Sequence, residues 1–272
     1  FQKVENKEEI LSTYKSNFEK RFSGEIDSAT FYMKTSAFSA NKTEELNNID
    51  WSKTVVLLAH CFFDSPHIYR DLLFPDFYEW ITFSLDTLSE RKDLTVLVKE
   101  HPNGLEENGP VFDQLKKKYK NTNIKFINKK TSNIQIFESK PKAIITAYGT
   151  AAAEFAYQGF PVLTIYDNPF TAYNFIHLAK TIDEYRKLLL KIDELEARPL
   201  KSEIIEYYYM QHFFFLKNRD ADYLKFGKYK GHTNSDEFLN DYLPKMNEAY
   251  FNMLDASMND GFEMIDWELS NQ

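Results

Sequence analysis

The sequence predicts an α/β protein with a doubly wound, mainly parallel sheet. Short apolar segments alternate with segments of helical periodicity five times between residues 54 and 166. Strands that are covered on both faces are typically continuous apolar runs, and short helical crossovers between such strands are typical of parallel sheets. With 272 residues, the chain has room for one large domain or two small ones.

The chain before the sheet is predicted to hold a helix and a connection. Residues 6–22 place apolar side chains at helical spacing, and Gly24 can end that helix. Residues 25–50 are polar with little pattern, and we expect them to pack on a part that this chain lacks. Residues 1–53 are therefore interpreted as an N-terminal helix and connecting segment.

Five predicted strands form the sheet, and a helix follows each of the first four. The strands cover residues 54–59, 94–98, 124–127, 143–147 and 161–165. The helices are expected from Pro75 onward and over residues 110–120, 133–139 and 150–158. We assign this Rossmann-like domain to residues 54–200.

After residue 180 the pattern becomes helical. Helices are expected over residues 181–196, 202–218 and 236–257. The second of these is rich in aromatic residues, which we interpret as packing. Residues 201–272 are therefore assigned to a C-terminal helical extension.

Composition excludes several classes of protein. The 33 Lys and Arg residues against 41 Asp and Glu residues give a net charge of −8, which argues against a general nucleic-acid binder. A hydrophobic content of 43% excludes a disordered chain. The single cysteine, Cys61, excludes a disulfide framework and a cysteine-based zinc site. No metal spacing is present, so we predict neither a metal nor another cofactor.

No apolar run is long enough to span a membrane, and the start of the chain has no signal-peptide pattern. The expected location is therefore the cytoplasm. A local basic face such as Lys116–Lys120 leaves room for peripheral contact with the inner membrane. The chain begins without Met, so we interpret it as part of a longer protein.

Candidate site residues follow the strands, because ligands bind outside the carboxyl ends of an open parallel sheet. His60 and Asp64 follow the first strand. Asp64 is a candidate general base or acceptor contact, although Asp-Ser-Pro is also good turn chemistry. Lys99 and His101 follow the second strand, and Pro102 holds His101 extended. The His101 imidazole can then donate to a phosphate oxygen, or serve a structural role.

The strongest signal follows the fourth strand, from Tyr148 to Glu154. Gly149 lets the backbone approach a ligand, Thr150 is expected to cap a helix, and Ala151 begins a run of small residues that leaves room for phosphate. Glu154 lies one residue too far from that cap for a capping box, so we expect it to be free to accept from a ribose diol. The alternative is an ordinary capped helix.

Ser132, after the third strand, has two interpretations. It can cap the following helix, or it can belong to a wall for a nucleotide base. Other motifs are absent from the sequence: there is no dinucleotide-binding Gly-x-Gly-x-x-Gly, no Walker A loop and no Gly-x-Ser-x-Gly elbow.

Three stretches resemble the C-terminal, donor-binding half of GT-B glycosyltransferases, in particular bacterial capsule and surface polysaccharide transferases. They are His60–Asp64 with the following Phe74–Trp80, the segment Val98–Pro102, and the segment Tyr148–Glu154 continuing through Gly159–Val162. The resemblance is to enzymes with a His-Pro motif, similar to Kdo, sialyl and polysialyl transferases. It implies that His101 and Thr150 bind the donor phosphate, that Glu154 lies near the ribose, and that no metal is needed.

The implied reaction is transfer of a sugar from a nucleotide-sugar donor, CMP-linked in one version, to a saccharide or lipid-linked acceptor in capsule or lipopolysaccharide synthesis. Asp64 and His101 are the catalytic candidates, and His60, Lys99, Ser132 and Tyr148 through Ala151 join Glu154 as candidate binding residues. Residues 1–53 are too short for the acceptor domain of such an enzyme, which is expected to be missing from this chain.

Three alternatives remain open from the sequence. The first is a teichoic-acid-type phosphotransferase that uses CDP-glycerol or CDP-ribitol. The second is a non-catalytic nucleotide-binding module of a larger polymerase, and the third is a GT-B-type epimerase.

Overall fold

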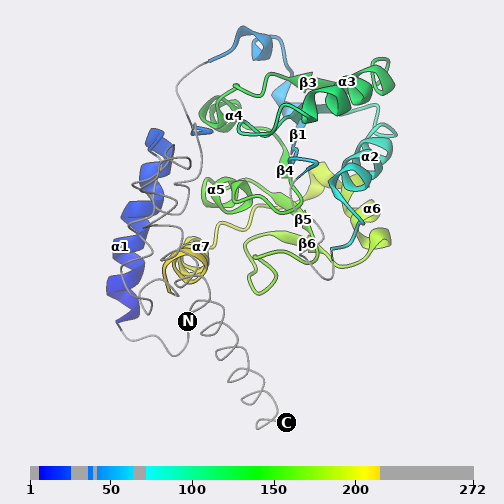
Figure 1. Ribbon diagram of the computed structural model, residues 1–272. Coiled ribbons are helices and arrows are strands. Elements are labelled where there is room, and N and C mark those ends of the chain that lie inside the picture. The colour runs from blue at the N-terminus through cyan, green and yellow to red at the C-terminus, as the bar shows by residue number, and fades with distance from the viewer. Residues whose placement is uncertain (1–5, 26–35, 39–41, 64–71, 215–272) are drawn as a thin grey trace, which may run out of the picture. The chain divides into compact units, whose positions relative to one another are not determined.

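The computed structural model describes residues 6–25, 36–38, 42–63 and 72–214, and its centre is a six-stranded parallel sheet (Figure 1). The strand order is β3-β2-β1-β4-β5-β6, and every neighbouring pair is parallel. This is the order of a doubly wound Rossmann-like sheet, and it confirms the predicted fold class. The strands are β1 (Thr54–Leu58), β2 (Thr95–Lys99), β3 (Ile124–Ile127), β4 (Ala143–Ile145), β5 (Val162–Ile165) and β6 (His177–Ala179).

The five predicted strands are all present, and β6 was not predicted. β6 has three residues, one of them a histidine, so it offers no apolar run. It is recognisable only by its pairing with β5, in which Thr164 is the partner of Leu178.

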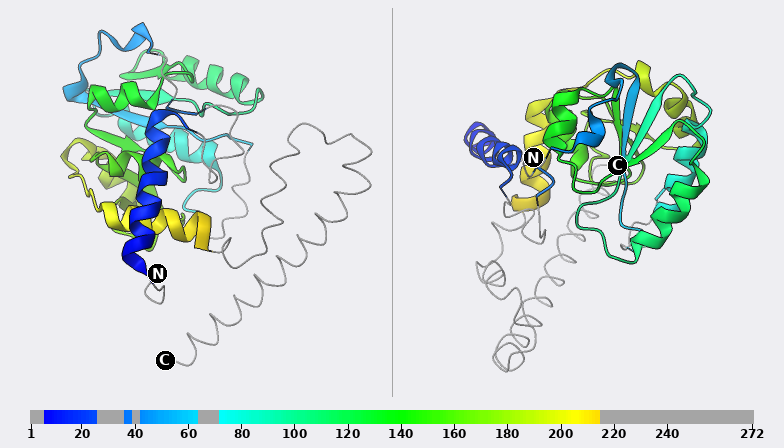
Figure 2. Two further views of the ribbon diagram at one scale, coloured as in Figure 1. Left: turned by 90° about the vertical axis from the view of Figure 1, so that its left-hand side faces the viewer. Right: turned by 90° about the horizontal axis from the view of Figure 1, so that it is seen from above.

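Helices cover both faces of the sheet (Figures 1 and 2). On one face lie α2 (Phe77–Leu88), α3 (Asn108–Lys118) and α6 (Ile182–Leu190), and on the other lie α4 (Asn133–Ser139) and α5 (Ala151–Tyr157). Side-chain caps fix several starts: Asp76 accepts from the Glu79 N–H of α2 at 2.8 Å, and Thr181 accepts from the Glu184 N–H of α6 at 3.1 Å.

Two further helices pack together outside α5. They are α1 (Lys7–Glu19), which continues into the 3-10 turn η1 (Lys20–Ser23), and α7 (Lys201–Tyr209), which continues into the π-helical turn η6 (Met210–Phe214). Gly24 follows η1 with φ at 88°, as expected for the residue that ends this helix. The remaining short turns are η2 (Glu44–Leu46), η3 (Trp51–Lys53) and η5 (Ile192–Glu194).

Aromatic rings hold α1 against α7 and α5. The Phe18 ring lies 5.1 Å from the Tyr208 ring and 5.2 Å from the Tyr157 ring, both edge-on. The segment that follows also packs within the chain, since Phe38 and Leu46 are buried. The expectation that residues 25–50 pack on a missing part is therefore wrong for these two side chains.

Residues 1–211 form one compact unit, so the expected boundaries after residues 53 and 200 fall inside it. A second unit spans His212–Gln272, of which the structure describes His212–Phe214. The helix expected over residues 236–257 lies outside the described residues. Within the described part of the chain, no helix is both long and apolar enough to cross a membrane.

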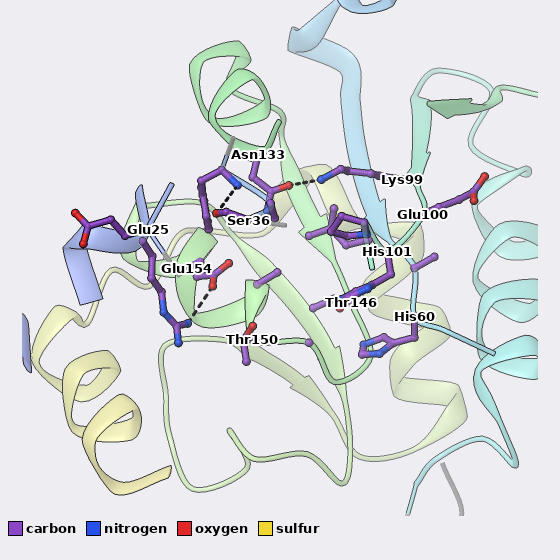
Figure 3. A pocket seen from close by; sticks show the side chains of 18 residues that line it. Glu25, Ser36, His60, Lys99, Glu100, His101, Asn133, Thr146, Thr150 and Glu154 are labelled. Atoms are coloured by element: carbon purple, nitrogen blue, oxygen red, sulfur yellow. Dashed lines mark hydrogen bonds and ion pairs between the residues drawn. The ribbon is translucent and has the colours of Figure 1, made fainter. Parts of the chain in front are cut away.

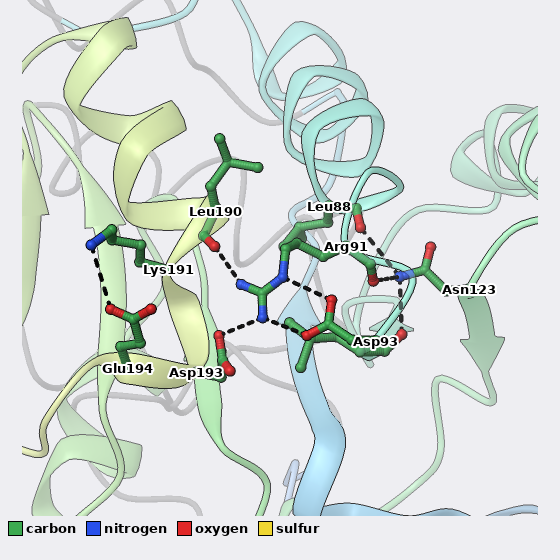
Figure 4. Close-up of polar contacts among 9 residues, drawn as sticks. Leu88, Arg91, Asp93, Asn123, Leu190, Lys191, Asp193 and Glu194 are labelled. Atoms are coloured by element: carbon green, nitrogen blue, oxygen red, sulfur yellow. Dashed lines mark hydrogen bonds and ion pairs between the residues drawn. The ribbon is translucent and has the colours of Figure 1, made fainter.

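The amino edge of the sheet is closed by a polar cluster around Arg91, at the end of α2 (Figure 4). The guanidinium binds the Asp93 carboxylate through Nε at 2.9 Å and Nη2 at 2.7 Å, and Nη2 also lies 2.9 Å from Asp193 Oδ1. Its Nη1 donates to the Leu190 carbonyl at the end of α6. Beside it, the Asn123 amide donates to three backbone carbonyls around the end of α2 and the start of β2. These bonds fasten α2, α6 and β3 to one another.

Candidate functional site

A pocket lies at the opposite, carboxyl edge of the sheet, where β1, β2 and β4 end (Figure 3). It holds about 720 Å³ of empty space, including the solvent at its mouth. The strand order reverses direction between β1 and β4, and crevices at such a switch point are where ligands bind in doubly wound sheets. The walls come from the residues after these strands, from the starts of α4 and α5, and from the N-terminal segment around η1 and residues 36–38.

Lys99 is the last residue of β2 and is buried, with 3% of its surface exposed. Its Nζ donates to Asn133 Oδ1 at 2.6 Å. Among the described residues, no carboxylate lies within ion-pair distance of this ammonium. Burial lowers the pKa of Lys99 to about 8, and the charge of Glu154 opposes that shift. A buried cation with only an amide partner is costly, and an anion in the pocket would compensate it.

His101 lies beside Lys99 at the end of β2 and lines the same pocket. Its Nδ1 accepts from the Asn103 N–H at 3.2 Å, in the turn that Pro102 begins. In the neutral ring the proton therefore lies on Nε2, so that this nitrogen is a hydrogen-bond donor. Donor character at Nε2 suits contact with a phosphate oxygen.

His60 has a different environment. Its ring stacks on Phe77, with centroids 4.5 Å apart, and meets Trp80 edge-on. Its Nε2 accepts from the Tyr148 N–H at 3.1 Å. Burial lowers the pKa of His60 to about 3, and the nearby His101 adds to the shift. His60 is thus neutral and holds the backbone after β4 in place.

The space around Gly149 is tight for a side chain. A Cβ at this position would lie 3.3 Å from Thr146 Oγ1 and 3.5 Å from His60 Nε2. These neighbours are protein groups that line the pocket, and the close approach of the Gly149 backbone to a ligand stays a prediction. Tyr148 packs partly buried against the core, and Gly149, Thr150 and Ala151 face the pocket.

Thr150 stands at the expected helix start, but its side chain forms no cap hydrogen bond. Its backbone is already helical, and its carbonyl accepts from the Ala153 N–H at 3.1 Å. The prediction that Thr150 caps the helix is therefore wrong, because an N-cap normally needs non-helical backbone angles for its side chain to accept from the N–H two or three residues ahead. The hydroxyl lines the pocket instead. Helix α5 has seven residues, so its dipole is small.

Glu154 is buried on α5 and lines the pocket, but its carboxylate is not free. Oε1 accepts from Arg21 Nη1 at 3.1 Å, and the two side chains are 7% and 3% exposed. The expectation of an unengaged carboxylate is therefore wrong. The sequence offers no local signal for this pair, since the partner comes from η1, at the other end of the described chain.

Of the other candidates, Ser132 is buried but does not line the pocket. Its Oγ accepts from the Ile134 N–H at 3.1 Å, which makes it the N-cap of α4, as one of the two interpretations held. Asp64 lies outside the described residues.

Several pocket residues were not found from the sequence. Thr146 lies inside the predicted strand 143–147, and Asn133 lies at the end of the polar segment that was interpreted either as a solvated loop or as a wall for a nucleotide base, so neither was singled out. The N-terminal wall comes from Arg21, Glu25 and residues 36–38. This wall is tied to α4 by the Asn133 N–H, which donates to the Ala37 carbonyl at 2.8 Å.

The pocket residues can hold an anion between an ammonium, an imidazole and a hydroxyl. Within the described ranges, no group of three or more His, Cys, Asp or Glu side chains could hold a metal ion. The absence of a metal requirement stays a prediction.

No family model matches the chain, and no curated protein matches it. Solved structures match parts of this chain at low identity and with TM-scores below 0.5. TarM matches with 12% identity and a TM-score of 0.39, over 69% of this chain and 37% of that protein. The pneumococcal O-GlcNAc transferase GtfA, solved with UDP and GlcNAc, matches with 17% identity and a TM-score of 0.37, over 60% and 36%. The wall teichoic acid polymerase TagF matches with 17% identity and a TM-score of 0.38, over 86% and 62%. This chain thus spans between 36% and 62% of their lengths.

Proposed function

We propose that this chain is the donor-binding part of a glycosyltransferase of GT-B type, and that its pocket takes the nucleotide of a nucleotide-sugar. The observation that carries the proposal is Lys99: a buried ammonium at the switch point of a Rossmann-like sheet, with an amide as its partner and a pocket beside it. The three sequence stretches that resemble such enzymes converge on the same pocket, which supports the assignment.

In the proposed reaction, the bond between the anomeric carbon and the donor phosphate oxygen breaks, and a bond forms from an acceptor hydroxyl oxygen to that carbon. Lys99, His101 and Thr150 stabilise the charge that builds on the leaving phosphate. Asp64 is proposed as the base that takes the acceptor proton. Glu154 is proposed to accept from the ribose diol.

The finer assignments belong to the same proposal. The donor is CMP-linked, as the resemblance to Kdo, sialyl and polysialyl transferases implies. The acceptor is a growing capsule or surface polysaccharide, or its lipid-linked precursor, held by a separate acceptor domain. The reaction needs no metal and takes place in the cytoplasm, with peripheral contact at the inner membrane.

The test is a calorimetric and thermal-shift panel of CMP, CDP, UDP, GDP and ADP on this chain. We expect selective binding of one nucleotide, and a ligand at about 100 times its Kd adds about 2.7 kcal/mol to the free energy of unfolding. His101→Ala should abolish that gain while the unliganded Tm stays close to wild type. His177→Ala is the matched control, because His177 lies on β6 and does not line the pocket.

If His101→Ala binds the nucleotide as tightly as wild type does, His101 is not part of the phosphate site. If none of the nucleotides binds, the donor-site assignment itself is rejected. If one nucleotide binds, three donors are incubated with acceptor glycan: the sugar conjugate of that nucleotide, CDP-glycerol and CDP-ribitol. The products distinguish sugar transfer, polyol-phosphate transfer and binding without turnover.

A further inference from the structure

The N-terminal segment contributes a buried cation to the pocket. Arg21 lies in η1 and is 3% exposed. Arginine is rarely buried to this extent unless its charge is paired. Its guanidinium donates to Glu154 Oε1 at 3.1 Å, and its Cζ lies 4.9 Å from the Tyr208 ring centroid and 5.5 Å from that of Phe18. Elements from both ends of the described chain therefore meet at this side chain, next to α5.

A second hydrogen bond joins α5 to the N-terminal segment. The Tyr157 hydroxyl, at the end of α5, donates to Glu19 Oε1 at 2.6 Å, at the end of α1. The burial of Tyr157 and this carboxylate together hold the pKa of the phenol well above its usual value, so it stays a donor. Helix α5 is thus attached to the N-terminal segment at two points, and one of them is a pocket residue.

Figure 3 shows how charges are distributed around the pocket. Glu154 lies on one side, while Lys99, His101 and His60 lie on the other. Arg21 is the hydrogen-bond partner of Glu154. Glu154 is close enough to influence the charge of Lys99, so its carboxylate stands between two buried cations and touches one of them. Removal of one partner of a buried ion pair leaves the other charge uncompensated, so Arg21 contributes to the charge and position of this carboxylate.

We propose that Arg21 is a positioning residue of the nucleotide pocket: it fixes the ionised Glu154 carboxylate, and thereby makes recognition of the nucleoside part of the ligand depend on the docked N-terminal segment. This inference rests on the proposed function, which assigns Glu154 to the ribose. Arg21 itself does not touch the phosphate, which is left to the Lys99 side of the pocket. Two ligands, one with a nucleoside and one without, therefore separate its role from a general effect on the fold.

The experiment compares Arg21→Met, Arg21→Lys, Glu154→Gln and the double variant R21M/E154Q in the 272-residue chain. Affinity is measured for inorganic phosphate and for the nucleotide that wild type binds best in the panel of CMP, CDP, UDP, GDP and ADP. Arg186→Met is the matched control, because Arg186 forms an exposed ion pair with Glu90 away from the pocket. Circular dichroism and Tm verify that each variant is folded.

We expect Arg21→Met to lower nucleotide affinity about tenfold or more, the usual effect of losing a charged hydrogen bond, and to change phosphate affinity less than about twofold. Glu154→Gln should give a similar loss, and the double variant should be no weaker than either single variant, because both remove the same interaction. Arg21→Lys keeps the charge and should recover part of the loss. Arg186→Met should change neither affinity.

Equal losses for both ligands, or losses that multiply in the double variant, would show a structural role and overturn the inference. If Arg21→Met does not fold, Arg21→Lys and Glu154→Gln take its place. The same ratio of nucleotide affinity to phosphate affinity then decides the role of Arg21. A wild-type chain that binds no nucleotide rejects the proposed function itself. A wild-type chain that binds one while Arg21→Met binds it equally well rejects only the role of Arg21.

Discussion

The two edges of the sheet each hold a cation among polar partners, and the partners differ. At the amino edge, Arg91 has two carboxylates and a backbone carbonyl from its own chain. At the carboxyl edge, Lys99 is more deeply buried and has the amide oxygen of Asn133. The amino edge supplies its own counter-charges, whereas the carboxyl edge holds a cation next to empty space.

The difference separates two uses of buried charge. A compensated cluster such as that of Arg91 fastens helices and strands, and its removal should affect stability. An uncompensated ammonium lowers stability, so a protein gains from it only when a ligand supplies the missing charge. Variants at the carboxyl edge should therefore change ligand affinity, whereas variants at the amino edge should change the free energy of unfolding.

The largest expected effect is that of Lys99→Met on ligand binding. We expect nucleotide affinity to fall about 100-fold, because the anion loses its buried counter-charge. The free energy of unfolding should stay constant or rise, since methionine fills the space without a desolvation cost. Calorimetry and urea denaturation measure the two quantities. Lys125→Met, on the exposed side of β3, is the control, and a Lys99→Met chain that binds nucleotide normally would remove the distinction between the edges.

Arg91→Met should have the opposite profile. It removes the bonds to Asp93, Asp193 and the Leu190 carbonyl, and we expect a loss of about 2 kcal/mol in the free energy of unfolding, a value moderated by the partial exposure of the cluster. Nucleotide affinity should be unchanged. A variant of wild-type stability in urea denaturation would mean that this cluster does not fasten α2 to α6.

As the pH rises, nucleotide affinity should fall while the stability of the fold increases. With a pKa of about 8 in the fold, Lys99 loses its proton between pH 7 and 9, and nucleotide affinity should fall about tenfold over that range. In the unfolded chain the same lysine keeps its proton to about pH 10.4, so the unfolded state binds more protons and stability rises with pH.

The contribution of the amino edge to stability should not change between pH 7 and 9. The bonds from Arg91 lower the pKa of Asp93 to about 2, so its contribution to stability is complete above the usual pKa of an aspartate and is lost as the pH falls toward 2. Calorimetric titrations of wild type and Lys99→Met at pH 7, 8 and 9 test the assignment. If the variant keeps the wild-type pH dependence, another group is responsible.

The smallest expected effect is that of Ser132→Ala, close to the pocket but outside it. Loss of the bond to the Ile134 N–H should cost about 1 kcal/mol of stability, the usual value for an N-cap. Nucleotide affinity should not change. Weaker nucleotide binding without a change in stability would restore the interpretation of Ser132 as part of a wall for the base.

The sequence predicted the fold and the edge of the sheet that forms the pocket, and it missed the wall on the N-terminal side. Apolar runs such as Val55–Leu58 and Leu94–Val98 identify buried strands by themselves, and Lys99 and His101 follow from where a strand ends. Arg21 could not be assigned in this way, because its charge suits a solvated helix face just as well. Its role depends on a contact with Glu154 across 133 positions of the sequence, and no local pattern encodes such a contact.

β6 and Thr150 show two further limits. A three-residue strand with a histidine is defined by the hydrogen bonds of its neighbour, and the sequence alone does not contain those bonds. Thr150 is a residue type that often caps helices, but the chain enters α5 with helical angles already at this position. In both cases tertiary context overrides local preference.

The pairing of α1 with α7 has a consequence for synthesis of the protein. Arg21 leaves the ribosome well before α7, but one of the rings that enclose its guanidinium, that of Tyr208, belongs to α7. Translation proceeds at roughly 5–20 residues per second, so the Rossmann-like strands have time to emerge and pair before α7 arrives. The wall of the pocket that contains Arg21 is therefore completed last, and a ribosome-bound chain that ends before α7 carries the sheet without a finished pocket.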